Sequence, residues 1–354
     1  MPAFLRQSPR ARGSSEPSPL RPVAERRLAA GSIPGNMRST FRRQDVTFTA
    51  DGVACGAWLY LPEVPTPPPV IVMAHGLGGV RELRLDAFAE RFSGAGYACL
   101  VFDYRHFGSS AGEPRQLLSI RRQREDWAAA VRWVRERPEV DGDRVVLWGT
   151  SFSGGHVLAT AADDPAITAV IAQCPFTDGV ASARATSVAS SLRILPRALA
   201  DLVCSALGLR RVMLPLAGPP RSAALMTALD SVAGTVALRP QGVDFRDEVT
   251  ARIALDLVFS APGRRARDIA CPVLFCVCEH DTVAPAKATL RAARRAPRHE
   301  IEGYPCGHFD IYLGDAFERV VAAQIAFLGR QLGTRDTPRE KAGVSKQHGE
   351  RHEH

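Results

Sequence analysis

A serine that follows a short apolar run and lies between small residues constrains this fold more than any other feature of the chain. The apolar run is Val145–Trp148, and Gly149-Thr150-Ser151-Phe152-Ser153 leads from it into residues compatible with a helix. A serine at a sharp strand-to-helix turn adopts a strained backbone conformation, and small residues two positions before and after it let the strand and the helix approach each other. Gly149 and Ser153 satisfy this requirement. The stretch therefore predicts a strand, a nucleophile elbow and a helix, with Ser151 as the nucleophile.

Two other interpretations of this stretch are open. Ser153 also lies between small residues, Ser151 and Gly155, but a turn centred on it would begin two residues later and leave Gly149 without a role. We therefore favour Ser151 on the geometry of the elbow. The second alternative is a glycine-rich turn without chemistry, because such turns are common.

Apolar runs and amphipathic segments alternate along most of the chain. An antiparallel hairpin is predicted at 44–62, with its turn at Asp51-Gly52. Strands alternating with helices predict the α/β fold class, in which a mostly parallel sheet is flanked by helices. Runs typical of buried strands lie at 70–74, 97–102, 145–148, 167–172, 272–278 and 299–302, and amphipathic segments typical of helices lie between most of them and around 317–328.

The alternation breaks between residues 178 and 268, where no strand is predicted. Helical patches at 192–207, 223–229 and 249–257 are separated by Gly and Pro clusters. We expect a helical cap inserted above the carboxyl edge of the sheet, where it covers the serine and shapes the substrate pocket. Its apolar residues either line that pocket or form the cap's own core. The predicted domains are an α/β core at 44–177 and 269–332, a cap at 178–268, and disordered tails at 1–43 and 333–354.

The positive charge of the chain lies mainly in its N-terminal tail. The 354 residues hold 45 Lys and Arg against 37 Asp and Glu, a formal net charge of +8, yet residues 1–43 alone hold nine Arg and two acidic residues. Residues 331–354 add one further positive charge, so residues 44–330 carry no net charge. A neutral core gives no support to a nucleic-acid-binding face. Whether translation starts at Met1 or at Met37 is open.

Membrane insertion and metal binding find no support in the sequence. No segment is apolar over the length that a membrane-spanning helix needs, and the N-terminus lacks the apolar core of a secretory signal. The eight cysteines are scattered without the spacing of a zinc site. We therefore expect free thiols, no bound metal and a cytoplasmic location. The oligomeric state is open.

Three chemically complementary residues lie at or just after predicted strands. Ser151 is at the elbow, Asp281 follows the strand at 272–278, and His308 lies in the loop after the strand at 299–302. A serine hydroxyl is a poor nucleophile at neutral pH, so His308 would act as general base. Asp281 would hold the imidazole tautomer and stabilise the imidazolium. Glu279 and Asp310 are alternative acids.

A glycine loop, His75-Gly76-Leu77-Gly78-Gly79, follows a predicted buried strand. Such a loop can turn backbone N–H groups toward one point, as an oxyanion requires. We predict that the N–H groups of Leu77 and Phe152 form the oxyanion hole. A phosphate-binding loop is the competing interpretation, but neither a Walker lysine nor a complete G-x-G-x-x-G is present.

Other polar residues near these loops are more simply explained by structure than by chemistry. The rival bases would pack in loops or helices, and the charged residues after the strand at 97–102 would fix the backbone by hydrogen bonds. The rival bases are His75, His156 and His280, and the charged loop residues are Asp103, Arg105 and His106.

These motifs together resemble the α/β-hydrolase superfamily over about residues 44–332. The chain order Ser151, Asp281, His308 is characteristic of that superfamily. More narrowly, Asp103–Ser110 with Gly112–Arg115 is similar to the dienelactone-hydrolase-related and X-prolyl-dipeptidyl-peptidase-like branch, which includes esterases, thioesterase-like enzymes and fungal polyketide acyltransferases. The motifs that carry the wider resemblance are His75–Gly79, Gly149–Gly154 and Gly307–Asp310.

The resemblance implies an α/β-hydrolase fold with an inserted helical cap, and a serine hydrolase that needs no cofactor. Such an enzyme cleaves a small-molecule ester or thioester through an acyl-serine intermediate. An acyltransferase with the same triad, which passes the acyl group to an alcohol or amine, is one alternative. A non-catalytic module that binds a small apolar ligand is another. A peptidase is less favoured, because the cap offers no identifiable anchor for a peptide amino group.

Overall fold

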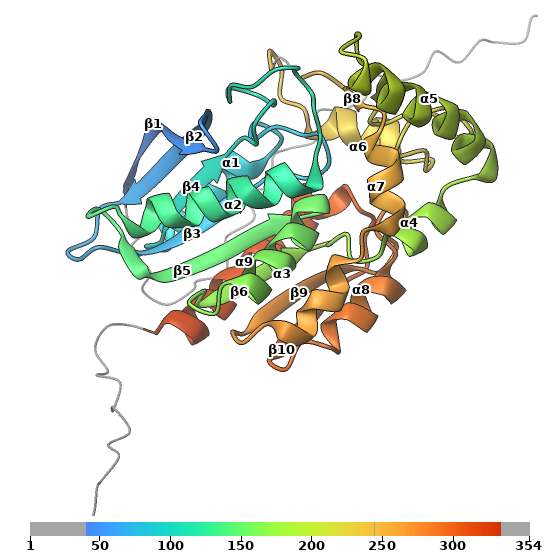
Figure 1. Ribbon diagram of the computed structural model, residues 1–354. Helices are drawn as coiled ribbons and strands as arrows, with labels where there is room; N and C mark the ends of the chain where they lie inside the picture. Colours follow the sequence, from blue (N-terminus) through green and yellow to red (C-terminus); the bar gives the residue numbers. More distant parts are fainter. Residues whose placement is uncertain (1–39, 244, 334–354) are drawn as a thin grey trace, which may run out of the picture. The chain divides into compact units, whose positions relative to one another are not determined.

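The computed structural model describes residues 40–243 and 245–333, and a sheet of eight strands forms its centre. In spatial order the strands are β1 (Phe41–Ala50), β2 (Val53–Pro62), β4 (Ala98–Phe102), β3 (Pro69–Ala74), β5 (Asp141–Thr150), β6 (Ala169–Gln173), β9 (Val273–Cys278) and β10 (His299–Tyr304). The β1–β2 and β2–β4 pairs are antiparallel, and the other neighbours are parallel. The predicted mostly parallel α/β sheet is therefore confirmed (Figure 1).

Helices cover both faces of the sheet because the central strands are apolar on both sides. Along β3, Val70, Val72 and Ala74 pack into one core cluster, whereas Ile71 and Met73 pack into the other. All five are fully buried. Since neighbouring side chains of a strand point to opposite faces, each face gains its own helical layer. The first cluster includes residues of α2 (Ile120–Arg135), α3 (Phe152–Asp163) and α8 (Ala286–Ala293), and the second includes residues of α1 (Leu85–Gly94) and α9 (Gly314–Leu332).

The first strand begins slightly earlier than the predicted core boundary at residue 44. β1 starts at Phe41, because the pairing with β2 continues as far as the Phe41–Pro62 pair. Residues 1–39 and 334–354, which make up most of the two predicted tails, lie outside the described residues. Within the described ranges, no helix is both long enough and apolar enough to cross a membrane.

Residues 178–268, which we call the insert, are mainly helical. The insert contains α4 (Gly179–Ala185), α5 (Val188–Ala206), α6 (Ser231–Leu238), α7 (Ile253–Phe259), the 3-10 helix η1 (Pro262–Asp268), and the short strands β7 (Met213–Pro215) and β8 (Glu248–Thr250). The expectation of no strand here is wrong, since β7 and β8 pair antiparallel. The helix expected at 223–229 is also wrong, because these residues form turns and a bridge between Ala217 and Met226. Strands of three residues are too short for a period of two to be recognised.

The carboxyl ends of the parallel strands bring distant segments of the chain together. β3 leads into the loop at residues 75–79, β5 into Ser151, β9 into the loop with Asp281, and β10 into the loop with His308. Because these strands run in the same direction, the four segments meet at one edge of the sheet. Figure 1 shows the helices of the insert beyond the tip of β5.

Candidate active site

Ser151 lies at a sharp turn between β5 and α3. Its φ of 56° and ψ of −121° are strained for a residue with a side chain. Backbone hydrogen bonds hold this conformation: the Ser151 N–H donates to the carbonyl of Gln173 (2.9 Å), and the Ser151 carbonyl accepts from the N–H groups of Gly154 (3.0 Å) and Phe176 (2.8 Å). The predicted elbow geometry is therefore present at Ser151.

Ser153, the alternative nucleophile, lies in a different environment. It is fully buried, and its hydroxyl accepts a hydrogen bond from the Tyr104 hydroxyl at 3.0 Å. Its backbone φ is not in the left-handed region, whereas that of Ser151 is. The strained position that an elbow nucleophile occupies thus belongs to Ser151.

Gly149 allows the close approach of strand and helix at the elbow. A Cβ at this position would lie 2.4 Å from the carbonyl oxygen of Ser153 and 2.8 Å from Cγ1 of Val157.

We predict that Gly149→Ala lowers the free energy of unfolding by about 3 kcal/mol or more, because the backbone must shift. Urea denaturation measures this loss. Gly329→Ala in α9 is the matched control: a Cβ there meets nothing within 4 Å, so stability stays equal or rises. Equal stability of Gly149→Ala and the wild type would contradict this account of the elbow.

The structure brings the three predicted catalytic side chains together. Nε2 of His308 lies 3.0 Å from Oγ of Ser151, and Nδ1 of His308 lies 2.7 Å from Oδ2 of Asp281. Oδ1 of Asp281 accepts from the N–H groups of Val283 (2.8 Å) and Ala284 (2.6 Å). The side chains of His308 and Asp281 are only 3% and 1% exposed. A hydroxyl, an imidazole and a carboxylate therefore form one hydrogen-bonded chain that is largely shielded from water.

The environment of His308 favours its protonated form. Burial lowers the pKa of the imidazole, but the negative charge of Asp281, followed by Cys174, the hydrogen bond to Asp281 and the charge of Asp230, raises this pKa to about 9. Imidazolium is the form that appears when a histidine takes a proton from a serine hydroxyl. Asp281 thus orients the ring and stabilises the charge that proton transfer would create.

The alternative acids and bases do not contact Ser151. Asp310 accepts a hydrogen bond from the backbone of its own loop (2.8 Å), and Glu279 and His280 are exposed. Burial lowers the pKa of His75 to about 4 and that of His156 to about 3, so both rings are neutral near pH 7. Their positions are those of packing residues.

The charged residues of the loop after β4 bind other parts of the core. Each of them is buried and has a partner away from Ser151. Oδ1 of Asp103 accepts from the N–H of Arg81 (2.9 Å), the N–H of Arg105 donates to Asp126 (3.0 Å), and Nε2 of His106 lies 2.9 Å from Nη1 of Arg122. These contacts fix the loop, as the sequence suggested.

The two predicted oxyanion donors lie beside Ser151. Phe152 is the first residue of α3, so its N–H has no acceptor within the helix and lies at the positive end of the helix dipole. Leu77 follows Gly76, where a Cβ would lie 3.0 Å from Cβ of Ser151. In the part of the chain that the structure describes, neither N–H group donates to a protein acceptor. Both are thus available to an oxyanion, and their role stays a prediction.

The insert packs directly on the loop that carries Leu77. Gly78 has a φ of 60°, and a Cβ there would lie 2.5 Å from Cδ2 of Leu216 and 2.9 Å from Cγ1 of Val249. Leu216 and Val249 belong to the insert and are buried. The conformation of the glycine loop therefore depends on the insert as well as on β3.

Ser151 lies between two cavities of unequal size. The larger has a volume of about 450 Å³ and is lined mainly by apolar side chains of α4, α5 and α7, together with Phe152. The smaller has a volume of about 70 Å³ and is lined by His308 and Phe309, among others. Leu77 and Ser151 line both. This arrangement suits a molecule with a large apolar part and a small part, joined at the group that reacts with Ser151.

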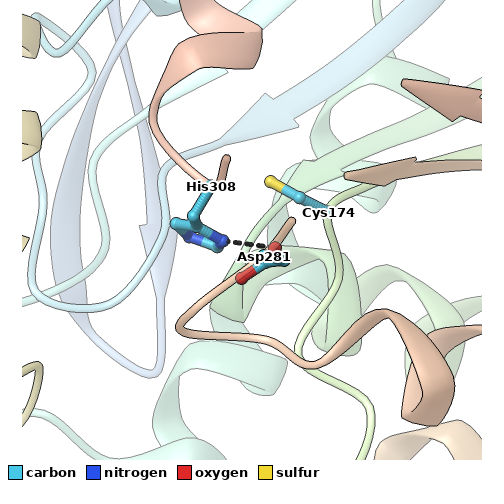
Figure 2. A group of neighbouring side chains, drawn as sticks. All are labelled: Cys174, Asp281 and His308. Atoms are coloured by element: carbon cyan, nitrogen blue, oxygen red, sulfur yellow. Dashed lines mark hydrogen bonds and ion pairs between the residues drawn. The ribbon is translucent and has the colours of Figure 1, made fainter. Parts of the chain in front are cut away.

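Cys174 is a neighbour of the site that the sequence did not reveal. Figure 2 shows its thiol beside Asp281 and His308, and one potential metal-ligating atom of each of the three residues lies within 4.8 Å of the other two. Nδ1 of His308 already binds Asp281, so a metal at that nitrogen would have to break this hydrogen bond. The predicted absence of a metal stays a prediction. Nothing in the sequence separates Cys174 from the cysteines that lie in apolar runs.

Sequence comparisons relate this chain to known proteins. A profile of the X-Pro dipeptidyl-peptidase (S15 family) matches residues 51–203. The quorum-quenching protein AidA of Acinetobacter baumannii is 54% identical over 286 residues, which are 81% of this chain and 94% of AidA. The thiohydrolase AneE of Aspergillus aculeatus is 38% identical over 128 residues, which are 36% of this chain and 40% of AneE.

Comparison with solved structures identifies the fold as that of α/β hydrolases. The crystal structure of the α/β hydrolase GrgF from a Penicillium species matches with a TM-score of 0.71 and 26% identity, covering 83% of this chain and 100% of GrgF. GrgF is described as a polyketide transferase. With hydrolases and acyl-transferring enzymes as relatives, this chain is an enzyme of one of these two kinds. It belongs to the α/β-hydrolase superfamily as a member of the same family as AidA, and residues 51–203 are similar to the X-Pro dipeptidyl-peptidase (S15) family.

Proposed function

We propose that the chain is a serine hydrolase that cleaves a small-molecule ester or thioester through an acyl-serine intermediate. The observation that carries the proposal is the hydrogen-bonded chain of Ser151, His308 and Asp281 at the elbow. The thiohydrolase and polyketide transferase among the relatives support acyl chemistry. The name of AidA, a quorum-quenching protein, agrees with a small molecule as the substrate.

In the proposed first half-reaction, Oγ of Ser151 attacks the carbonyl carbon while Nε2 of His308 takes the hydroxyl proton. The carbonyl oxygen becomes an oxyanion and binds the N–H groups of Leu77 and Phe152. When the bond to the leaving group breaks, His308 returns the proton to the leaving alcohol or thiol, and the acyl group stays on Ser151. In the second half-reaction water attacks the acyl-serine in the same way and releases the acid.

The two cavities suggest which part of the substrate lies where. His308 must protonate the leaving atom, and it lines the cavity of about 70 Å³, so the leaving group belongs on that side. The acyl chain then lies in the cavity of about 450 Å³, whose lining is mainly apolar. We infer a substrate with an apolar acyl chain and a small alcohol or thiol next to the reacting carbonyl.

The second candidate function is acyl transfer, which the polyketide transferase GrgF favours. Both reactions share the acyl-serine and differ only in the molecule that attacks it. A panel of p-nitrophenyl esters and CoA thioesters, turned over with and without added alcohols and amines, separates the two. A hydrolase releases mainly the free acid at every acceptor concentration. Acyl-acceptor products that outweigh the acid would favour the transferase.

The acyl cavity gives a prediction on chain length. Ala254 on α7 lines the cavity, and Ala254→Phe would fill part of it. We predict a roughly tenfold loss of kcat/KM for decanoate esters with little change for acetate esters, because the long chain loses its space. Ala233→Phe makes the same change at an exposed position of α6 and leaves both substrates unaffected. An equal effect of Ala254→Phe on both esters would place the acyl chain elsewhere.

A cytoplasmic location is part of the proposal. All eight cysteines lie in the described part of the chain, and all are free thiols. Reduced thiols are typical of proteins in a reducing compartment.

A further inference from the structure

Helix α5 of the insert turns its apolar side away from the protein. The side that packs on the insert holds Ser190, Ala198 and Asp201. The carboxylate of Asp201 accepts from the N–H groups of Val212 (2.9 Å) and Arg252 (3.1 Å), which anchors the helix. The large apolar side chains are exposed instead: Val188 (76%), Leu192 (68%), Leu195 (47%), Leu199 (48%), Leu202 (50%) and Val203 (56%).

This arrangement reverses the usual pattern of a helix on a protein surface. An amphipathic helix normally buries its apolar stripe and exposes its polar side. A contiguous apolar patch of this kind on a protein surface marks an interaction site. Figure 1 shows α5 along the outer side of the insert, away from the central sheet.

The spacing of the exposed residues is that of a helix-pairing seam. Val188, Leu192, Leu195, Leu199 and Leu202 are separated alternately by four and three residues. This is the a/d pattern of a coiled coil, in which each a or d side chain inserts between four side chains of the facing helix. At about 100° per residue, the five side chains lie within one narrow stripe. The pattern therefore fits another helix better than a flat or irregular partner.

The charges on α5 lie away from the seam and leave it free of charged side chains. The positions beside the seam hold uncharged residues, including Pro196 and Val203. The exposed Arg193 and Arg197 lie more than about 100° around the helix from the centre of the stripe. A second α5 could therefore approach the seam without bringing like charges together.

The seam is continuous with the large cavity. Val188, Leu192 and Leu195 of the seam also line the cavity of about 450 Å³, as does Phe259, which is 86% exposed. The cavity is consequently open to solvent beside α5. A helix lying on the seam would cover this opening with apolar side chains.

We propose that α5 pairs with α5 of a second copy of this chain across a two-fold axis, and that the second copy closes the open side of the acyl cavity. The same seam on both copies is self-complementary, as an isologous dimer requires. Each copy then holds a site whose apolar wall is complete only in the dimer. The pairing itself does not depend on the enzymatic activity, whereas the closure of the acyl cavity rests on the proposed function.

Sedimentation velocity of the full chain tests the pairing. We expect a species of twice the chain mass at micromolar concentration. Leu199→Asp with Leu202→Asp places two charges on the seam at residues that do not line the cavity, and dimerisation should weaken by at least about 100-fold, because four carboxylates would be buried unpaired. The matched control is Arg193→Glu with Arg197→Glu, which adds two acids to the same helix off the seam and leaves the dimer intact. Circular dichroism checks that all variants fold.

Two outcomes would overturn the pairing. The wild type could stay monomeric at all concentrations, or the Leu199→Asp, Leu202→Asp variant could stay dimeric. If a monomeric wild type binds phosphatidylglycerol vesicles and the variant does not, the stripe is a lipid-binding surface. Each result contradicts a second copy as the occupant of the seam.

Ester turnover tests the closure of the cavity. In the Leu199→Asp, Leu202→Asp variant we expect an acetate ester to react at nearly the wild-type rate. For a decanoate ester we expect kcat/KM to fall roughly tenfold, because without the second copy part of the decanoyl chain stays exposed to water. Equal effects on both esters would contradict the closure. A wild type that is dimeric but turns over no ester would overturn the proposed function and leave the pairing in place.

Discussion

Ser151→Ala is expected to lower kcat/KM for a p-nitrophenyl ester by about 10,000-fold or more. The change removes the oxygen that would form the acyl-serine, while the imidazole 3.0 Å away and the N–H groups of Leu77 and Phe152 stay in place. Binding and the oxyanion donors alone retain only a small part of the rate enhancement of a serine hydrolase. Labelling by a fluorophosphonate probe should disappear with the turnover.

Ser153→Ala is the matched control, because it removes a hydroxyl two residues away. It loses the hydrogen bond from Tyr104 but no atom of the proposed chemistry, so labelling and most of the turnover remain. If labelling survived in Ser151→Ala and vanished in Ser153→Ala, Ser153 would be the nucleophile. Unchanged turnover in Ser151→Ala would contradict the proposed role of Ser151 as nucleophile and would favour a non-catalytic module that binds a small apolar ligand.

Asp281→Asn is expected to reduce kcat/KM by about 1,000- to 10,000-fold and to move its pH dependence. The base must be neutral to accept a proton, and the pKa of His308 is raised to about 9, so wild-type activity should rise with pH until about pH 9. Asparagine removes the largest of the charges that raise the pKa of His308, while burial continues to lower this pKa. The rise in activity should therefore occur at lower pH in the variant. Measurements of kcat/KM between pH 5 and pH 10 give both effects.

Asp310→Asn is the control for this experiment, because Asp310 is the other acid in the same loop. Its carboxylate binds a backbone N–H of the loop and does not contact His308. We expect a pH profile close to that of the wild type and a rate within a few fold of it. A larger loss of kcat/KM in Asp310→Asn than in Asp281→Asn would indicate that Asp310, and not Asp281, is the acid that assists His308.

The core of the fold and the three proposed catalytic residues could be predicted from local sequence. The elbow was recognisable because Gly149 and Ser153 flank Ser151 after an apolar run. Asp281 and His308 could be placed near Ser151 because each follows a strand, and the carboxyl ends of parallel strands share one edge. Those inferences depend on short-range patterns and on one rule of topology.

The orientation of α5 and the surroundings of Cys174 could not be predicted in this way. Helical periodicity identified α5 but not which side faces the protein, and the structure buries Ser190 and Asp201 while leaving Leu192 exposed. That choice depends on hydrogen bonds to residues far along the chain, such as the N–H of Arg252. Cys174 resembles a core thiol until the loops after β9 and β10 are folded against it.

The tight packing at Gly78 limits the motions that are available for substrate entry. Leu216 and Val249 press on the glycine that follows Leu77, so lifting this part of the insert would also displace Leu77. In a close-packed interior such a displacement would disturb the N–H group that we assign to the oxyanion. Substrate entry and product release should therefore occur without movement of this part of the insert, while the glycine loop stays rigid.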